Sequence, residues 1–516
     1  MAILLDDHVA AHPDRAALVD ELGTTTWAEL RTRVTRLSRA MADRGLGSGD
    51  TIAVMMGNRR EIYEILLAAA HTGFTVVPVN WHWVADELAY VIEDSGARAL
   101  LVGDRFVDVA TAALADPRSA SIEFSAVAGS GDLDDYEDLV ASGGDEPLED
   151  QLLGGPMFYT SGTTGRPKGV RGMLSGGQGI PSEIFQLICA GMADYVPNDG
   201  TTVLCGPAYH SAQWAFSFMP LVNGSTVVMQ HKFDAAGALA LIDEHNATNL
   251  HLVPTQFKRM LDLPDDVRSG FDGSSLVAVW HGAAPCPAPW KRAMIGWLGP
   301  VVHEYYGSTE GAFISVIHSD DWLERGGSVG KPLEVMEVFV VDDDGNHLAA
   351  NETGTLYFKN AMGSDFEYHN DPEKTAEAHL EPGVFTTGDV GHLDDDGYLW
   401  LSDRKIDMII SGGVNIYPAE IETVISENGA VEDVAVIGVP NEEFGEEVKA
   451  IVAVSDPSVD RAALEATLLE DCRDRLAGYK RPRSVDFVDE MPRTGTGKIL
   501  KRALREPYWA DAGRAI

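Results

Sequence analysis

Short apolar runs alternate with helix-like segments through the first 330 residues, and this alternation constrains the fold more than any other feature of the sequence. The apolar run 51–56 ends at a Gly-Asn pair, and residues 61–70 follow with a helical pattern. Further strand-like runs occupy residues 74–79, 99–102, 225–229 and 249–253. Strands separated by helices are typical of layered α/β folds. The sequence therefore predicts an α/β architecture, and 516 residues predict more than one domain.

The pattern changes over residues 338–400, where short strands such as 355–358 alternate with turns. Asp-Asp-Gly occurs at 343–345 and again at 395–397. Such turns join antiparallel strands, so this stretch predicts a small β subdomain.

A second unit begins after Asp403, with strand-like runs near 434–437 and 449–454 and a helical pattern over 461–475. We expect a large N-terminal domain, residues 1–403, made of layered α/β subdomains plus the small β subdomain. A small α+β C-terminal domain should occupy residues 404–516.

Charge and composition exclude several classes of function. The net charge is −41, from 39 basic and 80 acidic residues, which argues against binding to nucleic acid or anionic membranes. No secretory signal is recognisable at the N-terminus, and no apolar run approaches the ~20 residues of a transmembrane helix. We expect a cytoplasmic protein whose cysteines are reduced thiols; these are Cys189, Cys205, Cys286 and Cys472.

The most informative segment is Tyr159-Thr-Ser-Gly-Thr-Thr-Gly-Arg-Pro-Lys-Gly-Val170, which contains the first lysine of the chain. Glycines allow close backbone approach, hydroxyls donate hydrogen bonds and a lysine supplies a cation. The segment therefore predicts a phosphate-binding loop. Its candidate residues are Thr160, Ser161, Gly162, Thr163, Thr164, Gly165 and Lys168.

Other phosphate and nucleophile motifs fit this segment poorly. A Walker A loop needs Ser or Thr after its lysine, but Gly169 follows Lys168. The hydrolase elbow needs Gly two positions before its Ser, and Tyr159 stands there. An ordinary Gly/Thr turn is the remaining alternative, and the complete string disfavours it.

The string resembles the phosphate loop of the adenylate-forming superfamily, which includes acyl-CoA synthetases, luciferases and peptide-synthetase adenylation domains. This resemblance implies further motifs downstream. Residues 305–310, Tyr-Tyr-Gly-Ser-Thr-Glu, are similar to the second nucleotide motif of the family. The resemblance implies that Tyr306 packs on adenine, Thr309 contacts phosphate and Glu310 helps to hold Mg²⁺. The remaining candidates for the nucleotide site are Gly307, Ser308 and the small-residue wall Gly282, Ala283 and Ala284.

Two further residues are implied to bind the nucleotide. Asp389, in Thr387-Gly-Asp389, looks like the family's aspartate that accepts both ribose hydroxyls. Arg404 would contact ribose or phosphate.

The stretch 402–422 resembles the interdomain hinge of the family and the loop that follows it. Ser411, Gly412 and Gly413 would face the pantetheine arm of CoA. One position departs from the pattern, because Ile406 stands where the family commonly has Asp or Lys. An apolar hinge could alter the rate at which the C-terminal domain rotates.

Pro492-Arg-Thr-Gly-Thr-Gly-Lys498 completes the set of motifs. The resemblance implies that Lys498 contacts the carboxylate and the α-phosphate during adenylation. An exposed basic loop is the alternative reading of such a segment. Lys498 also belongs to the densest basic cluster of the chain, which we expect to flank the nucleotide and CoA entrance. Its other members are Lys480, Arg481, Arg483, Arg493, Lys501 and Arg502.

The implied activity is that of an AMP-forming acid–thiol ligase with ATP and CoA as co-substrates and Mg²⁺ as cofactor. A carboxylate would attack the α-phosphorus of ATP, and CoA would then take the acyl group. Positioning and electrostatics would supply most of the acceleration. The catalytic candidates are Lys168, Thr164, Thr309, Glu310 and Lys498.

Residues 207–216 resemble the aromatic/His motif at the acyl pocket of the family. His210 and Trp214 are candidates for lining or gating the pocket, although a core role is nearly as well supported for each. The segment lacks the Asp that amino-acid-activating relatives use, which favours an acid without an α-amine. The pattern looks like that of fatty or cyclic acyl-CoA synthetases.

Three alternatives remain open on the sequence. The chain could load a carrier protein instead of CoA, although no carrier domain follows in the sequence. It could be a non-catalytic nucleotide sensor on the same fold, or a luciferase-like oxidase. A homodimer is compatible with the sequence, which leaves the oligomeric state undetermined.

Overall fold

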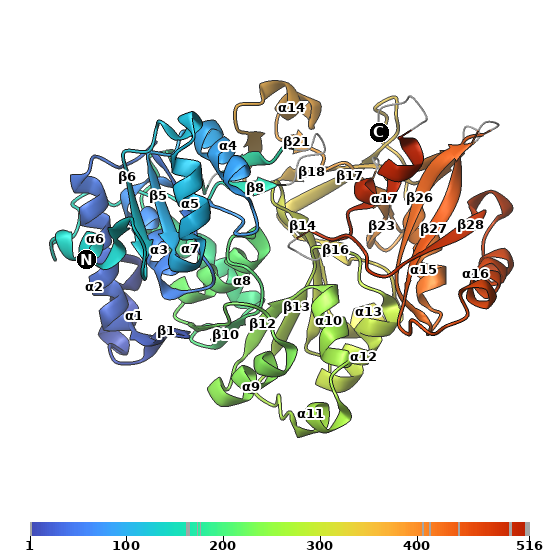
Figure 1. Ribbon diagram of the computed structural model, residues 1–516, viewed down its shortest axis with the longest axis horizontal. Helices are drawn as coiled ribbons and strands as arrows, with labels where there is room; N and C mark the ends of the chain where they lie inside the picture. Colours follow the sequence, from blue (N-terminus) through green and yellow to red (C-terminus); the bar gives the residue numbers. More distant parts are fainter. Residues whose placement is uncertain are drawn as a thin grey trace.

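The computed structural model describes residues 3–160, 166–172, 174–175, 177–404, 407–411, 414–441, 444–494 and 498–510. Five sheets organise this part of the chain. Figure 1 shows the N-terminal sheets at one end of the molecule and the C-terminal unit, in orange and red, at the other. Within the described ranges, no helix combines the length and the apolar character needed to cross a membrane.

The largest sheet runs in the order β16-β15-β14-β13-β12-β10-β11-β1-β2. Its central strands are parallel, while β2, β15 and β16 pair antiparallel at the edges. The strands are β1 (Ala16–Asp20), β2 (Gly23–Thr26), β10 (Thr201–Leu204), β11 (Thr226–Met229), β12 (Asn249–Leu252), β13 (Ala278–His281), β14 (Val302–Ser308), β15 (Ala312–Ile317) and β16 (Lys331–Pro332). The helices between them are α7 (Glu183–Ala190), α8 (Ser211–Val222), α9 (Ala235–His245), α10 (Pro254–Leu261), α11 (Asp265–Gly270), α12 (Ala288–Leu298) and α13 (Ser319–Glu324).

A second, parallel sheet has the order β4-β3-β5-β6-β7. Its strands are β3 (Thr51–Met55), β4 (Thr75–Pro78), β5 (Ala99–Gly103), β6 (Phe124–Ala128) and β7 (Asp134–Asp135). The accompanying helices are α1 (Asp6–Ala11), α2 (Trp27–Asp43), α3 (Arg60–Thr72), α4 (Ala85–Ser95), α5 (Val107–Leu114) and α6 (Tyr136–Ser142). Every residue of β3 and β5 is buried, as expected for parallel strands covered on both faces.

One continuous core joins the two parallel sheets. It contains residues of β3, α3, α8 and β11, so α3 and α8 lie between the sheets. The hydroxyl of Tyr63 on α3 donates to Ser217 on α8 at 2.7 Å, which satisfies a buried polar pair inside this core.

The β-rich stretch forms two smaller sheets. One runs β20-β21-β18-β22-β23 with β17 beside β18, and the other runs β19-β9-β8. The predicted turns are present, with Gly345 at φ 85° and Gly397 at φ 78°, values that favour glycine. The elements are β8 (Phe158–Thr160), β9 (Lys168–Gly172), β17 (Met336–Val341), β18 (Gly354–Asn360), β19 (Phe366–Tyr368), α14 (Pro372–Glu377), β20 (His379–Glu381), β21 (Val384–Phe385), β22 (Asp389–Leu393) and β23 (Leu399–Arg404).

The C-terminal unit has its own sheet and its own core. The sheet runs β25-β24-β27-β26, and β28 pairs parallel with β27. The elements are β24 (Ile409–Ser411), β25 (Val414–Ile416), α15 (Pro418–Ser426), β26 (Val431–Asn441), β27 (Gly445–Val454), α16 (Arg461–Arg475), β28 (Ser484–Val488) and α17 (Lys501–Trp509).

The predicted fold class is confirmed: a large α/β N-terminal part with a small β subdomain precedes a small α+β unit. The helix expected over 61–70 is α3, and the helix expected over 461–475 is α16 with the same bounds.

Candidate active site

The predicted phosphate loop connects two antiparallel strands. Thr160 at the end of β8 pairs with Lys168 at the start of β9. The loop residues Ser161, Gly162, Thr163, Thr164 and Gly165 lie outside the described residues. A hairpin therefore holds the two ends of the loop together.

Lys168 is held by a carboxylate that the sequence analysis did not single out. Its Nζ lies 2.8 Å from Oδ2 of Asp371 and 5.7 Å from the ring centroid of Tyr368. The side chain of Lys168 is 17% exposed, so it is not fully buried. The Lys168 cation is the main cause that lowers the pKa of Asp371 below its ordinary value.

The second nucleotide motif covers the end of β14 and its turn into β15. A Cβ at Gly307 would lie 2.0 Å from the carbonyl oxygen of Ala312, so only glycine fits this close approach. Thr309 Oγ1 lies 3.1 Å from Ser211 Oγ at the start of α8. Ser308 Oγ accepts a hydrogen bond from the backbone N–H of Gly311 at 2.9 Å. The motif is therefore a tight turn in which the hydroxyls of Ser308 and Thr309 are held by hydrogen bonds within the protein.

Glu310 lies in this turn, and its Oε1 accepts a hydrogen bond from the hydroxyl of Tyr368 at 3.1 Å. In the described part of the chain, no group of three His, Cys, Asp or Glu residues is arranged to hold a metal ion. A single carboxylate still fits Mg²⁺, because Mg²⁺ commonly takes one or two carboxylates together with substrate phosphates and water.

The small-residue wall follows β13, which is the parallel neighbour of β14. A Cβ at Gly282 would lie 2.6 Å from the ring of Tyr305 and 2.8 Å from its carbonyl oxygen. Ala283 has φ 67°, an unusual value for a residue with a side chain. Both motifs thus lie at the carboxyl ends of adjacent parallel strands, where α/β proteins commonly bind ligands.

Two hydroxyl groups hold the carboxylate of Asp389. Tyr306 donates to its Oδ2 at 2.5 Å and Thr387 donates to the same oxygen at 2.7 Å. Across the β22–β23 pair, Asp389 stands opposite Arg404, whose side chain lies outside the described part of the structure. The structure therefore brings Tyr306, Asp389 and the backbone of Arg404 together.

The predicted residues of the C-terminal unit are only partly described. Ser411 ends β24 and pairs with Val414, while Gly412, Gly413 and Ile406 lie outside the described residues. Lys498 is exposed, and its backbone exchanges hydrogen bonds with Thr494 at 2.8 and 3.1 Å.

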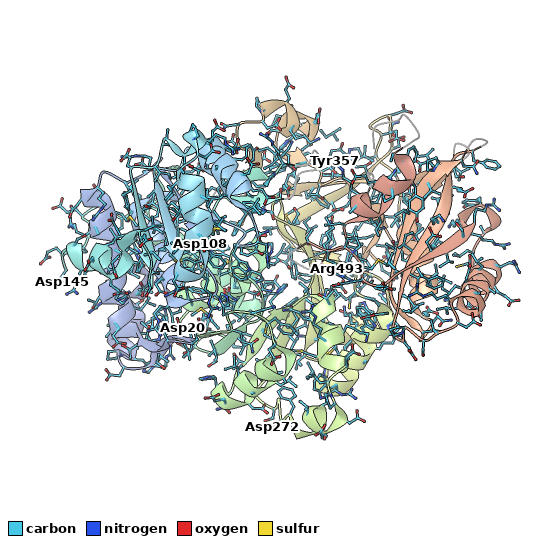
Figure 2. All side chains as sticks on the ribbon, viewed as in Figure 1. Asp20, Asp108, Asp145, Asp272, Tyr357 and Arg493 are labelled. Carbon is cyan, nitrogen blue, oxygen red and sulfur yellow. The ribbon has the colours of Figure 1, made fainter. Side chains whose placement is uncertain are left out.

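Part of the predicted basic cluster is paired within the C-terminal unit. Lys480 lies 2.6 Å from Glu420, and Lys501 lies 2.8 Å from Glu422. Arg493, labelled in Figure 2, pairs with Asp433. These carboxylates offset some of the positive charge that we expected at the entrance.

The candidate acyl-pocket residues belong to the first turn of α8 and the loop before it. The ring of Trp214 packs with Phe158, Phe185 and Phe218 at centroid distances of 5.9, 6.3 and 5.5 Å. Trp214 Nε1 and His210 Nε2 are buried without a hydrogen-bond partner in the described structure. Burial, together with nearby His82, lowers the pKa of His210 to about 3. His210 is therefore neutral at neutral pH.

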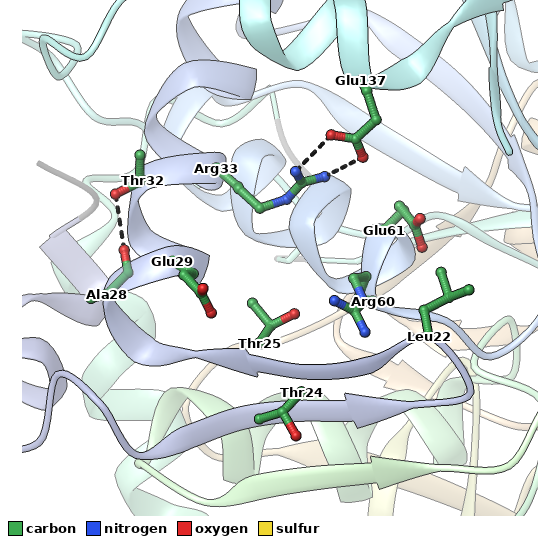
Figure 3. Close-up of a pocket in the computed structure, with 10 residues that line it drawn as sticks. All are labelled: Leu22, Thr24, Thr25, Ala28, Glu29, Thr32, Arg33, Arg60, Glu61 and Glu137. Carbon is green, nitrogen blue, oxygen red and sulfur yellow. Dashed lines mark hydrogen bonds and ion pairs between the residues drawn. The ribbon is translucent and has the colours of Figure 1, made fainter.

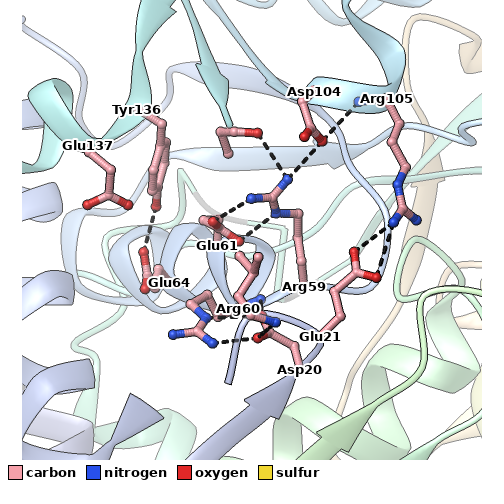
Figure 4. Close-up of polar contacts among 12 residues, drawn as sticks. Asp20, Glu21, Arg59, Arg60, Glu61, Glu64, Asp104, Arg105, Tyr136 and Glu137 are labelled. Atoms are coloured by element: carbon pink, nitrogen blue, oxygen red, sulfur yellow. Dashed lines mark hydrogen bonds and ion pairs between the residues drawn. The ribbon is translucent and has the colours of Figure 1, made fainter. Parts of the chain in front are cut away.

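An open groove of about 580 Å³ lies elsewhere, on the N-terminal part (Figure 3). Its lining includes none of the predicted site residues; it consists of Leu22, Thr24, Thr25, Ala28, Glu29, Thr32, Arg33, Arg60, Glu61 and Glu137. Arg33 pairs with Glu137 at 2.7 Å, and Arg60 pairs with Asp20 at 2.5 Å. Figure 4 shows the Arg60–Asp20 pair and, near it, further ion pairs in which Arg59 contacts Glu61 and Asp104 and Arg105 contacts Glu21. The groove is therefore separate from the predicted nucleotide motifs.

Sequence reasoning missed Tyr368, Asp371, Thr387 and Ser211 as contacts of the predicted site residues. Asp371 followed by Pro372 signals the start of a helix. Nothing in the sequence places that helix start beside Lys168, because the contact depends on the pairing of β19 with β9.

The chain is similar to known proteins in sequence and in fold. A family model described as AMP-binding enzyme matches residues 5–363, and one described as AMP-binding enzyme C-terminal domain matches residues 420–498. The chain is 36% identical over 490 residues to the feruloyl-CoA synthase of Amycolatopsis sp, with 94% of each chain covered. It is 33% identical over 492 residues to the long-chain-fatty-acid–CoA ligase FadD13 of Mycobacterium tuberculosis, covering 94% of this chain and 93% of the relative.

A solved structure shares the whole architecture. The o-succinylbenzoate CoA synthetase MenE from Bacillus subtilis, in complex with the acyl-adenylate intermediate OSB-AMP, matches with a TM-score of 0.79 and 26% identity over 97% of each chain. Because the two family models together span most of the sequence, this chain belongs to the AMP-binding enzyme family.

Proposed function

We propose that this protein is an acyl-CoA synthetase that activates a carboxylic acid with ATP and passes the acyl group to CoA. One observation carries the proposal: the carboxylate of Asp389 is fixed by Tyr306 beside the turn that carries Thr309 and Glu310. An acceptor suited to ribose hydroxyls therefore lies close to groups suited to phosphates and a metal ion, near the carboxyl end of β14. The family membership and the acyl-CoA ligases among the relatives support the same activity.

In the first half-reaction, a carboxylate oxygen of the acid attacks the α-phosphorus of ATP. A new P–O bond forms, the bond to the β-phosphate oxygen breaks, and pyrophosphate leaves with the electron pair. Lys168, Thr309 and Lys498 would stabilise the charge that shifts toward the leaving group. Glu310, together with the phosphates, would hold Mg²⁺, which neutralises part of that charge.

In the second half-reaction, the thiolate of CoA attacks the acyl carbonyl and AMP leaves as the mixed anhydride breaks. We assign residues 404–516 to a unit that rotates against residues 1–403 between the two steps. This rotation would withdraw Lys498 and present the loop that begins at Ser411 to the pantetheine arm. Ile406 would sit at the pivot.

The acid is a fatty, cyclic or aromatic carboxylic acid without an α-amine. The aromatic surroundings of Trp214 suit an apolar acyl group, since they offer rings and few charges. The two sequence relatives are named for feruloyl and long-chain fatty acyl groups, which fits this range.

The test is AMP production from MgATP with a panel of short, medium, long, aromatic and steroid-like acids, each with and without CoA. We expect sustained AMP release only when an acid and CoA are both present. AMP and acyl-AMP formation without any effect of CoA would instead favour transfer to a carrier protein. No AMP with any acid would contradict the proposed activity and favour a nucleotide-binding protein without catalysis.

A further inference from the structure

A short segment late in the N-terminal part lies along the phosphate-loop hairpin. β19 pairs antiparallel with β9, with Tyr368 opposite Val170. The next residue, His369, donates its backbone N–H to the carbonyl oxygen of Gly169 at 2.8 Å. Residues 366–369 therefore lie alongside the strand that begins at Lys168, although about 200 positions separate the two segments in sequence.

Asp371, just after this segment, makes two different contacts with its two carboxylate oxygens. Oδ2 lies 2.8 Å from Lys168 Nζ, and Oδ1 accepts the backbone N–H of Lys374 at 3.0 Å as the N-cap of α14. One contact is an ion pair with the expected phosphate-binding cation. The other is an ordinary structural cap.

Tyr368 contacts both groups that are expected to act on the phosphates. Its hydroxyl donates to Glu310 Oε1 at 3.1 Å, and its ring centroid lies 5.7 Å from Lys168 Nζ. A carboxylate that accepts a hydrogen bond on one oxygen has a restricted orientation. The tyrosine thus fixes Glu310 on one side and lies beside the lysine on the other.

We propose that Tyr368 and Asp371 are positioning residues of the phosphate site, in which Tyr368 orients Glu310 for the metal ion and Asp371 competes with the triphosphate for Lys168. This inference rests on the proposed function, since it takes MgATP as the ligand. An ammonium that is 2.8 Å from a carboxylate must leave it, at least in part, to reach a phosphate oxygen. Asp371 therefore lowers the affinity for ATP, and it holds the side chain of Lys168 in a fixed position when no ATP is bound.

Asp371→Asn separates the two roles of Asp371. The amide oxygen can still cap α14, but the negative charge beside Lys168 is gone. The ion pair is partly exposed, and such pairs contribute little, so we expect ATP to bind roughly 2- to 5-fold more tightly. Asp371→Ala removes both charge and cap, and comparison with the Asn variant isolates the cap. Asp460→Asn is the matched control, because Asp460 caps α16 in the C-terminal unit.

Tyr368→Phe keeps the ring and removes the hydrogen bond to Glu310. We expect the Mg²⁺ concentration for half-maximal ATP binding to rise by roughly 2- to 10-fold. ATP binding measured without Mg²⁺ should not change. Tyr357→Phe, on β18, is the matched control (Tyr357 is labelled in Figure 2).

The experiment is calorimetric titration of the full chain and its variants with ATP, in the absence of acid and CoA and at several Mg²⁺ concentrations. Tighter ATP binding by Asp371→Asn and a shifted Mg²⁺ dependence of Tyr368→Phe would support the inference. Weaker or unchanged ATP binding by Asp371→Asn, or a Tyr368→Phe curve equal to that of Tyr357→Phe, would overturn it while leaving the proposed activity intact. A wild-type chain that binds no ATP would overturn both.

Discussion

The hydroxyl of Tyr306 donates a hydrogen bond of 2.5 Å to Oδ2 of Asp389, across 83 positions of sequence. Tyr306 belongs to β14 of the largest sheet, and Asp389 begins β22 of the β subdomain. Asp389 is only 8% exposed, so its carboxylate is held at the junction of two sheets. A ribose that enters this junction would meet an acceptor whose orientation is already set.

Tyr306→Phe should raise the KM for ATP by roughly 10-fold and leave the KM for the acid nearly unchanged. The ring that we expect against adenine remains, but Asp389 loses a donor, and hydrogen bonds to charged groups contribute about 1.5–3 kcal/mol. Steady-state kinetics with each substrate varied in turn would measure both constants. Tyr305→Phe is the control, because the Tyr305 hydroxyl contacts His251 instead. A similar rise in both KM values would contradict a role confined to the nucleotide.

Lys498→Ala should lower the rate of adenylation by a factor on the order of 100 or more, because a cation that stabilises the transition state is lost. Thioester formation from supplied acyl-AMP should be largely retained. Pyrophosphate exchange and single-turnover transfer to CoA measure the two halves separately. Lys359→Ala, an exposed lysine of β18, should affect neither. Equal losses of rate in adenylation and in thioester formation would contradict a role of Lys498 in adenylation alone.

The architecture could be predicted from the sequence because it depends on local patterns. An apolar run indicates a buried strand, and a helical period indicates a helix. The structure has β3 in the apolar run 51–56 and α16 over the helical pattern 461–475. Tyr306 and Asp389 were identified through resemblance to a family, and the structure then showed that they touch.

The remaining contacts of the site could not be predicted, because they depend on long-range packing. The pairing of β19 with β9 places Asp371 beside Lys168, and no local pattern encodes that register. The buried pair of Lys291 and Glu304 was likewise invisible in the sequence, where a lysine on a helix normally indicates an exposed face.

Lys291→Met should destabilise the protein by about 3–5 kcal/mol, because it leaves Glu304 buried without its partner. Lys291 Nζ lies 2.5 Å from Glu304 Oε2, and the lysine side chain is 0% exposed. Burial lowers the pKa of Lys291 and raises that of Glu304, so each group depends on the other to stay charged. Replacing both, as Lys291→Met with Glu304→Leu, should recover much of the loss in urea unfolding. A double variant no more stable than the single one would show that the pair matters for packing and not for charge.

Trp214→Phe should change acid selectivity more than ATP affinity. Its buried Nε1 has no partner among the described residues, so an acid with a hydrogen-bond acceptor at this place could use it. For such an acid, we expect kcat/KM to fall by roughly 10-fold, whereas an apolar acid of the same shape should lose little. Phe218→Leu, which alters a neighbouring ring without removing a donor, is the control. Equal losses for both acids would mean that Trp214 acts only as part of the core.

His71 should make the protein less stable as the pH falls below about 6.5. The His71 ring is buried, its Nδ1 donates to the Leu67 carbonyl at 2.6 Å, and its Nε2 accepts the Leu4 N–H at 3.2 Å. Protonation of His71 Nε2 would turn this acceptor into a donor that faces the Leu4 N–H. Burial lowers the pKa of His71 from 6.5 to about 4.

Because the folded pKa of His71 is lower than the unfolded one, the unfolded chain binds more protons between pH 6.5 and pH 4. The contribution of His71 to stability is therefore complete above pH 6.5 and is lost as the pH falls to about 4, at about 1.4 kcal/mol per pH unit. His71→Gln removes the titrating group, so the slope of unfolding free energy against pH should decrease by that amount in this window. Exposed His12→Gln is the control and should leave the slope unchanged. An unchanged slope in the His71 variant would contradict this role of His71 and would point to other buried histidines as the source of the acid sensitivity. His251 would be the next to replace, because burial lowers its pKa to about 3.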